Sequence, residues 1–283
     1  MNNNSHEQWT QEITPHRGWL QVPIKEIWRY RDLLYLFVKR DFVAFYKQTV
    51  LGPLWFIIQP ILTTLMFTLV FGKIAGLSTD GLPQILFYLA GVTVWSYFAE
   101  CLTKTSTTFS DNAHLFGKVY FPRMIAPLAI IVSNLMKFGV QFCIFLVVFF
   151  YYWMQGLVQP NLAVLWLPYL IFLMAAISLG LGLIFSAMTA KYRDLRFLLT
   201  FGVQLFMYAT PIIYPLSAIP AKYVVYIQLN PITPIVEMFR YSFLGMGGAS
   251  VGAMLYASIF AATVLGLGMI VFNRLEVTFM DSV

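Results

Sequence analysis

Residues 161–190 read NLAVLWLPYLIFLMAAISLGLGLIFSAMTA and contain no charged side chain. A helix needs about 20 mostly apolar residues to cross the hydrocarbon core of a bilayer, so this stretch predicts a membrane-spanning helix. The rest of the chain has the same character, since 59% of its 283 residues are hydrophobic and only 11% are charged. Soluble domains carry about 25% charged residues. The sequence therefore predicts an all-α integral membrane protein.

Five further stretches are long and apolar enough to be spans, and only Lys137 interrupts any of them with a charge. With 161–190 they predict six transmembrane helices, which place both termini on the same side of the membrane. The predicted organisation is an N-terminal segment over 1–50, a membrane domain over 51–273 and a tail over 274–283. The five further stretches are 53–72, 81–99, 124–155, 197–215 and 251–272.

Lys and Arg residues gather on one side of this layout. Fourteen of the 18 lie before the first span, in the loops after the second and fourth spans, or in the tail. Cytoplasmic loops concentrate Lys and Arg, so both termini are predicted to be cytoplasmic. The same placement explains the net charge of +6 without a nucleic-acid partner. No apolar stretch begins before about residue 50, which argues against a cleaved signal peptide.

The segment 28–48 differs from the spans because basic residues alternate with an apolar face. Aromatic and Leu residues from Tyr30 to Tyr46 recur at helical spacing, with Arg and Lys between them. This pattern predicts an amphipathic interface helix that lies on the cytoplasmic membrane surface and contacts membrane lipid. The helix is either a simple anchor or also lines an entrance for a lipid-borne substrate. Candidates for the second role are Arg29, Arg31, Phe37, Arg40 and Tyr46.

The region 214–245, between the fifth and sixth spans, is rich in proline and carries short apolar pieces. Proline breaks helices and restricts the residue before it, so these pieces are too short to cross. Irregular backbone at membrane depth is tolerated only where protein or a water-filled cavity shields it. The region is therefore predicted to form re-entrant helices that cap a conduit, with a plain external loop as the alternative.

The chain lacks the motifs of common catalytic and nucleotide sites. It contains no GxxxxGK[ST], HExxH or GxSxG motif and no clustered His and Cys residues, which argues against ATP binding, catalysis and a metal site in this chain. Ion-coupled carriers are expected to have carboxylates inside the membrane, and the spans show almost none. A membrane transferase and an ion-coupled carrier are therefore disfavoured alternatives.

Lys137 lies 13 residues beyond Met124, about 20 Å along a helix. A charge at that depth is costly and should face a cavity or the interior of the bundle. It either contacts an anionic substrate group or pairs with a neighbouring polar group. Glu100 and Lys104, and separately Glu237 and Arg240, are spaced as local helix pairs.

Four stretches of the chain resemble a known family. They are VKRDFVAFYKQTVLGPLWFIIQP at 38–60, NAHLFGKVYFPRMIAPL at 112–128, YRDLRFLLTFGVQLFMYATPIIYP at 192–215, and NPIT at 230–233 with the tail FNRLEVTFMDSV. Together they are similar to the permease subunits of ABC-type exporters for O-antigen, capsular polysaccharide and teichoic acid. The resemblance implies a transport subunit, not an enzyme, in a bacterial inner membrane.

The resemblance also implies partners. It predicts a homodimer that works with two copies of an ATP-binding-cassette subunit, which would hold ATP and Mg²⁺, and that exports a polyprenyl-pyrophosphate-linked glycan. In such exporters the cytoplasmic loop after the second span docks on the ATPase, and the loop at 191–196 is a candidate for lesser contacts. The residues expected to take part are Asp111, Leu115, Lys118, Phe121, Arg123, Arg193 and Arg196.

The implied glycan path would run past the interface helix and leave beneath the re-entrant cap. Polar and aromatic side chains of the first and fifth spans are the candidates that line it, together with the charge in the third. An ABC permease for a drug or lipid remains the main alternative. The conduit candidates are Trp55, Gln59, Lys137, Gln204 and Tyr208.

Overall fold

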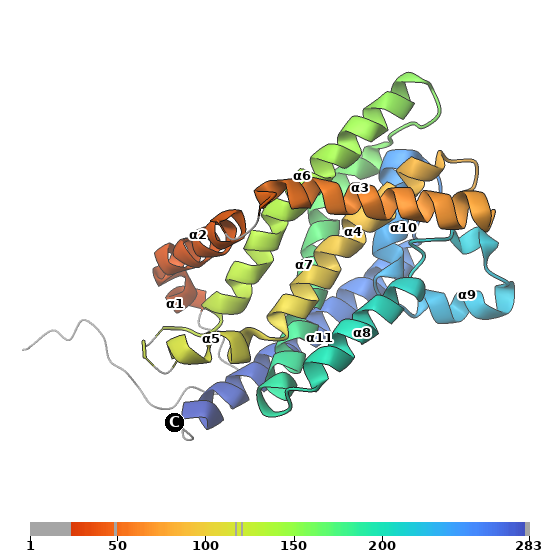
Figure 1. The fold of residues 1–283 in the computed structure, drawn as a ribbon. Coiled ribbons are helices and arrows are strands. Elements are labelled where there is room, and N and C mark those ends of the chain that lie inside the picture. The colour runs from red at the N-terminus through yellow and green to blue at the C-terminus, as the bar shows by residue number, and fades with distance from the viewer. Residues whose placement is uncertain (1–23, 48–49, 117, 120, 281–283) are drawn as a thin grey trace, which may run out of the picture.

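The computed structural model describes residues 24–47, 50–116, 118–119 and 121–280, and every regular element in these ranges is helical (Figure 1). Most of the chain forms one elongated bundle. The principal helices are α1 (Ile24–Arg29), α2 (Arg31–Lys47), α3 (Trp55–Phe67), α4 (Gln84–Thr105), α5 (Thr108–Phe116), α6 (Ile125–Met154), α7 (Leu167–Lys191), α8 (Leu195–Tyr208), α9 (Ala221–Gln228), α10 (Thr233–Leu244) and α11 (Val251–Met280).

Short helical turns extend some of these helices. A 3₁₀ turn, η1 (Gly52–Leu54), leads into α3, which continues as a π-helix, η2 (Thr68–Ile74). Two further 3₁₀ turns, η3 (Leu162–Trp166) and η4 (Leu216–Ala218), precede α7 and α9. The prolines of the sequence lie mainly at helix starts, where no backbone N–H is needed.

Five helical segments of the described chain are long and apolar enough to cross a membrane, and they match five of the six predicted spans. They are Gly52–Ile74, Gln84–Thr105, Ile125–Met154, Leu162–Lys191 and Val251–Arg274. The predicted span at 197–215 is shorter than expected, because α8 ends at Tyr208. Its 14 residues reach about 21 Å, less than the roughly 30 Å of a hydrocarbon core. The residues after it, ATPIIYP, carry two prolines that stop the helix.

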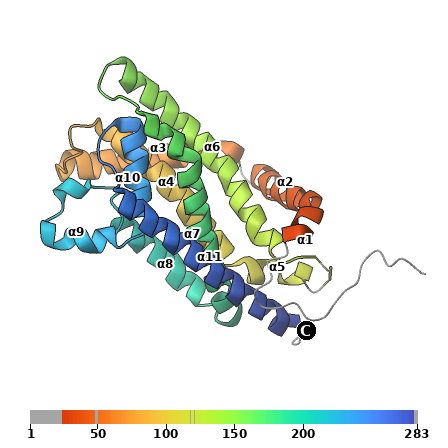
Figure 2. The same cartoon turned by 180° about the vertical axis from the view of Figure 1, so that it is seen from behind.

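The bundle is built around α4. This helix is buried along most of its length, and α3, α6, α7 and α8 surround it. Behind it, α7 packs along α11 (Figure 2). Glycine permits that close approach, since a Cβ added to Gly180 would lie 2.6 Å from the backbone nitrogen of Leu265. Gly180 of α7 and Gly268 of α11 therefore bring two helices of the same chain together, whereas Gly182 packs against Thr105 of α4.

The bundle has two distinct ends. The end of α11 lies beside α5 and the first turn of α8, where Arg196 pairs with Asp111, and we call this the C-terminal end. At the far end, Ser217 donates a hydrogen bond of 2.6 Å to Asp80, and the backbone N–H of Asn161 bonds to Ser242. The helix α8 begins at the C-terminal end, and the residues that follow it lead to Ser217 at the far end.

The far end is fixed by a buried arginine. Arg240, on α10, donates hydrogen bonds to the carbonyl oxygens of Pro211 and Ile212, and its guanidinium lies 3.7 Å from the Phe87 ring centroid. It also lies 3.5 Å from Glu237. The predicted pair on one helix therefore forms, and it is part of the core. Both α9 and α10 are too short to cross a membrane, and their partial insertion stays a prediction.

Candidate functional site

The C-terminal end carries α5, the helix that follows the second span. Its start is tied to α7, because the N–H of Phe109 donates to the Ser186 hydroxyl and Thr189 donates to the carbonyl of Ser106. The Phe109 ring lies 4.5 Å from that of Phe272, on α11. These contacts fasten α5 to two long helices, so a displacement of α5 would move the bundle.

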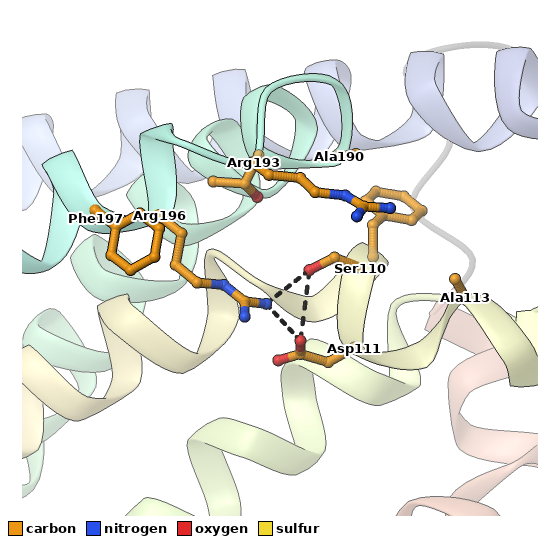
Figure 3. A pocket seen from close by; sticks show the side chains of 9 residues that line it. Ser110, Asp111, Ala113, Ala190, Arg193, Arg196 and Phe197 are labelled. Atoms are coloured by element: carbon orange, nitrogen blue, oxygen red, sulfur yellow. Dashed lines mark hydrogen bonds and ion pairs between the residues drawn. The ribbon is translucent and has the colours of Figure 1, made fainter.

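A second connection joins α5 to the first turn of α8. The guanidinium of Arg196 lies 2.6 Å from the Asp111 carboxylate and 3.0 Å from the Ser110 hydroxyl (Figure 3). A cavity of about 630 Å³ lies between these elements and is bordered by Arg193 and Phe197. Because both partners of the ion pair are about half exposed, this pair is accessible from outside the chain.

The predicted coupling residues fall into two groups. Asp111, Lys118, Arg193 and Arg196 are exposed, and Leu115 is half-buried. Phe121 and Arg123 are buried.

The two buried residues pack against the end of α5. The Phe121 ring lies 5.7 Å from that of Phe116, and the Arg123 guanidinium lies 5.5 Å from the same Phe116 ring. In the single chain their side chains therefore position the loop and do not face outward.

The segment of the predicted interface helix is helical, as α1 and α2, and its place at the membrane surface stays a prediction. Arg29, Arg31 and Arg40 are exposed, whereas Phe37 is buried; the side chain of Tyr46 lies outside the described residues. The Phe37 ring meets the Phe121 ring edge-on at 5.6 Å. No sequence pattern predicted this contact, which joins α2 to the loop that supports α5.

Lys137 belongs to a charged cluster with residues of α4. Its ammonium lies 2.6 Å from the Glu100 carboxylate and 5.1 Å from the Phe56 ring centroid. The same carboxylate accepts a bond of 3.2 Å from Lys104, which also contacts Asn134. Sequence reasoning did not identify Glu100 as the partner of Lys137, although Glu100 directly follows the predicted span 81–99 and Lys137, of opposite sign, is the charge within a predicted span.

The other conduit candidates lie on the surface of the single chain. Trp55 and Gln59 of α3, and Gln204 and Tyr208 of α8, are exposed. Both helices lie on the side of α4 that faces the viewer in Figure 1 and is opposite α7 and α11. The four residues are thus exposed on two helices that lie on this side of α4, and the single chain encloses none of them.

Comparison with known proteins gives consistent matches. Residues 32–244 match the family described as ABC-2 type transporter. The O-antigen export system permease protein RfbA of Klebsiella pneumoniae is 30% identical over 88% of this chain and 94% of its own length. The protein of the same name from Myxococcus xanthus is 28% identical over 78% and 83%. The polysialic acid transport protein KpsM of Escherichia coli is 24% identical over 82% and 89%.

Proposed function

The chain belongs to the ABC-2 type transporter family, and we propose that it is the membrane-spanning subunit of an ATP-driven exporter of lipid-linked polysaccharide. The observation that carries this proposal is its similarity, over most of both lengths, to permeases named for O-antigen export and to a transport protein named for polysialic acid. The cargo is accordingly a glycan on a polyprenyl pyrophosphate carrier, of the O-antigen type.

The chain works as a homodimer with two copies of an ATP-binding-cassette subunit, which bind ATP and Mg²⁺. The C-terminal end of the bundle is cytoplasmic, because α2, α5, the turn before α8 and the end of α11 bring most of the Lys and Arg residues there. The exposed residues Asp111, Lys118, Arg193 and Arg196 contact the ATPase. Phe121 and Arg123 transmit its movement through α5.

The glycan path lies between two copies of the chain. Trp55 and Gln59 of α3, and Gln204 and Tyr208 of α8, are exposed. Both helices lie on the same side of α4 (Figure 1), and a second copy placed there would enclose them. Aromatic faces and amide groups suit sugar rings and hydroxyls. The helices α9 and α10 cap the outer end as re-entrant helices, α8 serves as the sixth crossing, and α2 borders the substrate entrance at the cytoplasmic surface.

A permease for a drug or another lipid is the second candidate, because the ABC-2 family description alone does not specify a glycan. The two cargoes predict different cell phenotypes. Cells that lack a glycan exporter keep lipid-linked polysaccharide inside and lose it from the surface, whereas loss of a drug exporter leaves surface polysaccharide intact.

The test combines that phenotype with affinity capture of the tagged full chain from native membranes. We expect loss of surface polysaccharide without the chain, and recovery of a P-loop ATPase in near-equal amount. Lys118→Glu should reduce recovery of the ATPase, while Lys222→Glu, an equal charge change at the far end, should not. Unchanged surface polysaccharide in the deletion strain would overturn the glycan assignment, and capture of the chain without any ATPase would overturn the exporter class.

A further inference from the structure

A second cavity lies at the C-terminal end of the bundle. It is distinct from the cavity of about 630 Å³ that Arg193 and Phe197 border. It has a volume of about 480 Å³ and is enclosed by α2, α5, α6 and the start of α3, with Lys104 of α4 at its wall. The side chains that matter for its chemistry are Arg40, Phe56, Lys104, Ser133, Asn134 and Lys137. The cavity adjoins α2, which the proposed function places at the substrate entrance, but the proposed export cycle gives no role to Lys104, Ser133 or Asn134.

Positively charged side chains gather at the cavity. Lys104 and Lys137 lie 3.2 and 2.6 Å from the Glu100 carboxylate. Arg40 pairs with Asp41 at 2.8 Å, and Asp111 pairs with Arg196, so these seven groups comprise four positive and three negative charges. An anion in the cavity would therefore meet a favourable field.

Two buried polar groups in the cavity wall have no partner. The hydroxyl of Ser133 and the side-chain nitrogen of Asn134 are buried without a hydrogen-bond partner among the described residues. Asn134 is only 2% exposed, and its oxygen faces the Lys104 ammonium at 3.4 Å, which leaves its N–H groups for another acceptor. Burial of an unsatisfied polar group costs about 1–3 kcal/mol, so a bound acceptor would remove a penalty already present.

The residues around the cavity indicate which kind of hydrogen-bond acceptor would bind there. One wall of the cavity belongs to α2, a basic amphipathic helix of the kind that lies at the level of lipid headgroups. Phe42, Phe56 and Ile130 supply apolar surface at the same site, which suits the first carbons of a lipid tail. A phosphate group has several acceptor oxygens and a negative charge, so it can take bonds from Lys104, Ser133 and Asn134 together.

From this geometry we infer that the cavity binds the phosphate group of a membrane lipid, through Lys104, Ser133 and Asn134. Two lipids could supply that chemistry: a resident anionic phospholipid such as phosphatidylglycerol, or the pyrophosphate end of a polyprenyl carrier. The site is separate from the glycan path on the exposed face of α3 and α8. It does not rest on the proposed export function, because binding of a phospholipid requires neither glycan nor ATP.

The experiment measures lipid binding to the purified, delipidated complex by native mass spectrometry, with no ATP present. The probes are phosphatidylglycerol, a short polyprenyl pyrophosphate, and diacylglycerol as a phosphate-free control. The main variant is Ser133→Ala with Asn134→Leu, which keeps every charge and removes the two unsatisfied groups. We expect it to melt at the same or a higher temperature and to bind phosphate lipids about tenfold more weakly, the change expected on loss of hydrogen bonds to a charged group.

A second variant, Lys104→Gln, covers the case in which the double variant does not fold, since the Lys104 side chain is 47% exposed and its loss should be tolerated. Lys222→Gln is the matched control and should bind as the wild type does. Selective loss of phosphatidylglycerol binding identifies the resident lipid as the source, and selective loss of pyrophosphate binding identifies the carrier. Wild-type affinity of both site variants for both phosphate lipids, or equal binding of diacylglycerol, would overturn the inference.

Discussion

Glu100 holds two ammonium groups, those of Lys104 and Lys137, at 3.2 and 2.6 Å. The Lys137 side chain is only 13% exposed, so its charge depends on that carboxylate. Glu100→Gln keeps the shape of the side chain but removes this negative charge from beside the ammonium. We expect the free energy of unfolding to fall by about 1–3 kcal/mol, the usual penalty for an uncompensated buried polar group, measured as a lower melting temperature of the purified protein in detergent.

Two variants separate this loss of charge from a general effect of substitution. Asp32→Asn removes a carboxylate that is 92% exposed and lies 4.0 Å from Arg31, and it should leave the melting temperature unchanged. The double variant Glu100→Gln with Lys137→Met should recover part of the lost stability, because it also removes the stranded charge. If the double variant were less stable than Glu100→Gln alone, the pair would not be the reason for the loss.

At the scale of elements, the ion pair between α5 and the first turn of α8 is the contact most suited to transmit movement. Both Asp111 and Arg196 are about half exposed, so their pairing should add only about 0–1 kcal/mol to stability. Arg196→Asp should therefore leave folding unchanged. It should lower ATP-dependent export by roughly fivefold or more, which is the lower end of usual coupling energies between sites. The measurement is surface polysaccharide per cell beside the melting temperature.

The exchanged pair, Asp111→Arg with Arg196→Asp, restores attraction between the two elements and should recover export. Lys222→Asp, at the far end, is a useful comparison, because it exchanges a positive for a negative charge at an exposed residue outside the coupling contacts and should leave export unchanged. Full export by Arg196→Asp alone would show that the pair has no role in coupling.

The elements also show what can be predicted from sequence. Five long spans followed directly from uncharged stretches, because hydropathy depends on composition and length. The short α8 was not foreseen, since a hydropathy window counts ATPIIYP as apolar although its prolines end the helix. The role of Arg240 could not be foreseen either. Its acceptors, Pro211 and Ile212, are almost 30 residues away, and spacing identifies only neighbours on the same helix.

At the scale of the whole molecule, the proposed dimer requires one surface of the chain to face a second copy. The sequence alone does not identify that surface. The described chain leaves α3 and α8 exposed on one side, with large apolar side chains such as Leu62, Phe201 and Leu205 on the surface. Membrane lipid can cover such side chains. Exposed apolar residues also lie on α11, so apolar surface by itself does not distinguish the two faces. The polar residues Gln59 and Gln204 distinguish the face of α3 and α8, because an amide in contact with lipid tails would be costly.

We therefore expect two copies to meet, with their symmetry axis beside α3 and α8. In a symmetric dimer the same surface of both copies forms the interface, so one cysteine near the axis can reach its counterpart. With Cys101 and Cys143 replaced by Ser, Leu205→Cys should form a cross-linked dimer in native membranes under mild oxidation. Ile259→Cys on α11 is a matched control, since Leu205 and Ile259 are 53% and 66% exposed, and it should stay monomeric on a denaturing gel. Cross-linking at Ile259 but not at Leu205 would move the interface to the α11 side and remove the proposed glycan path with it.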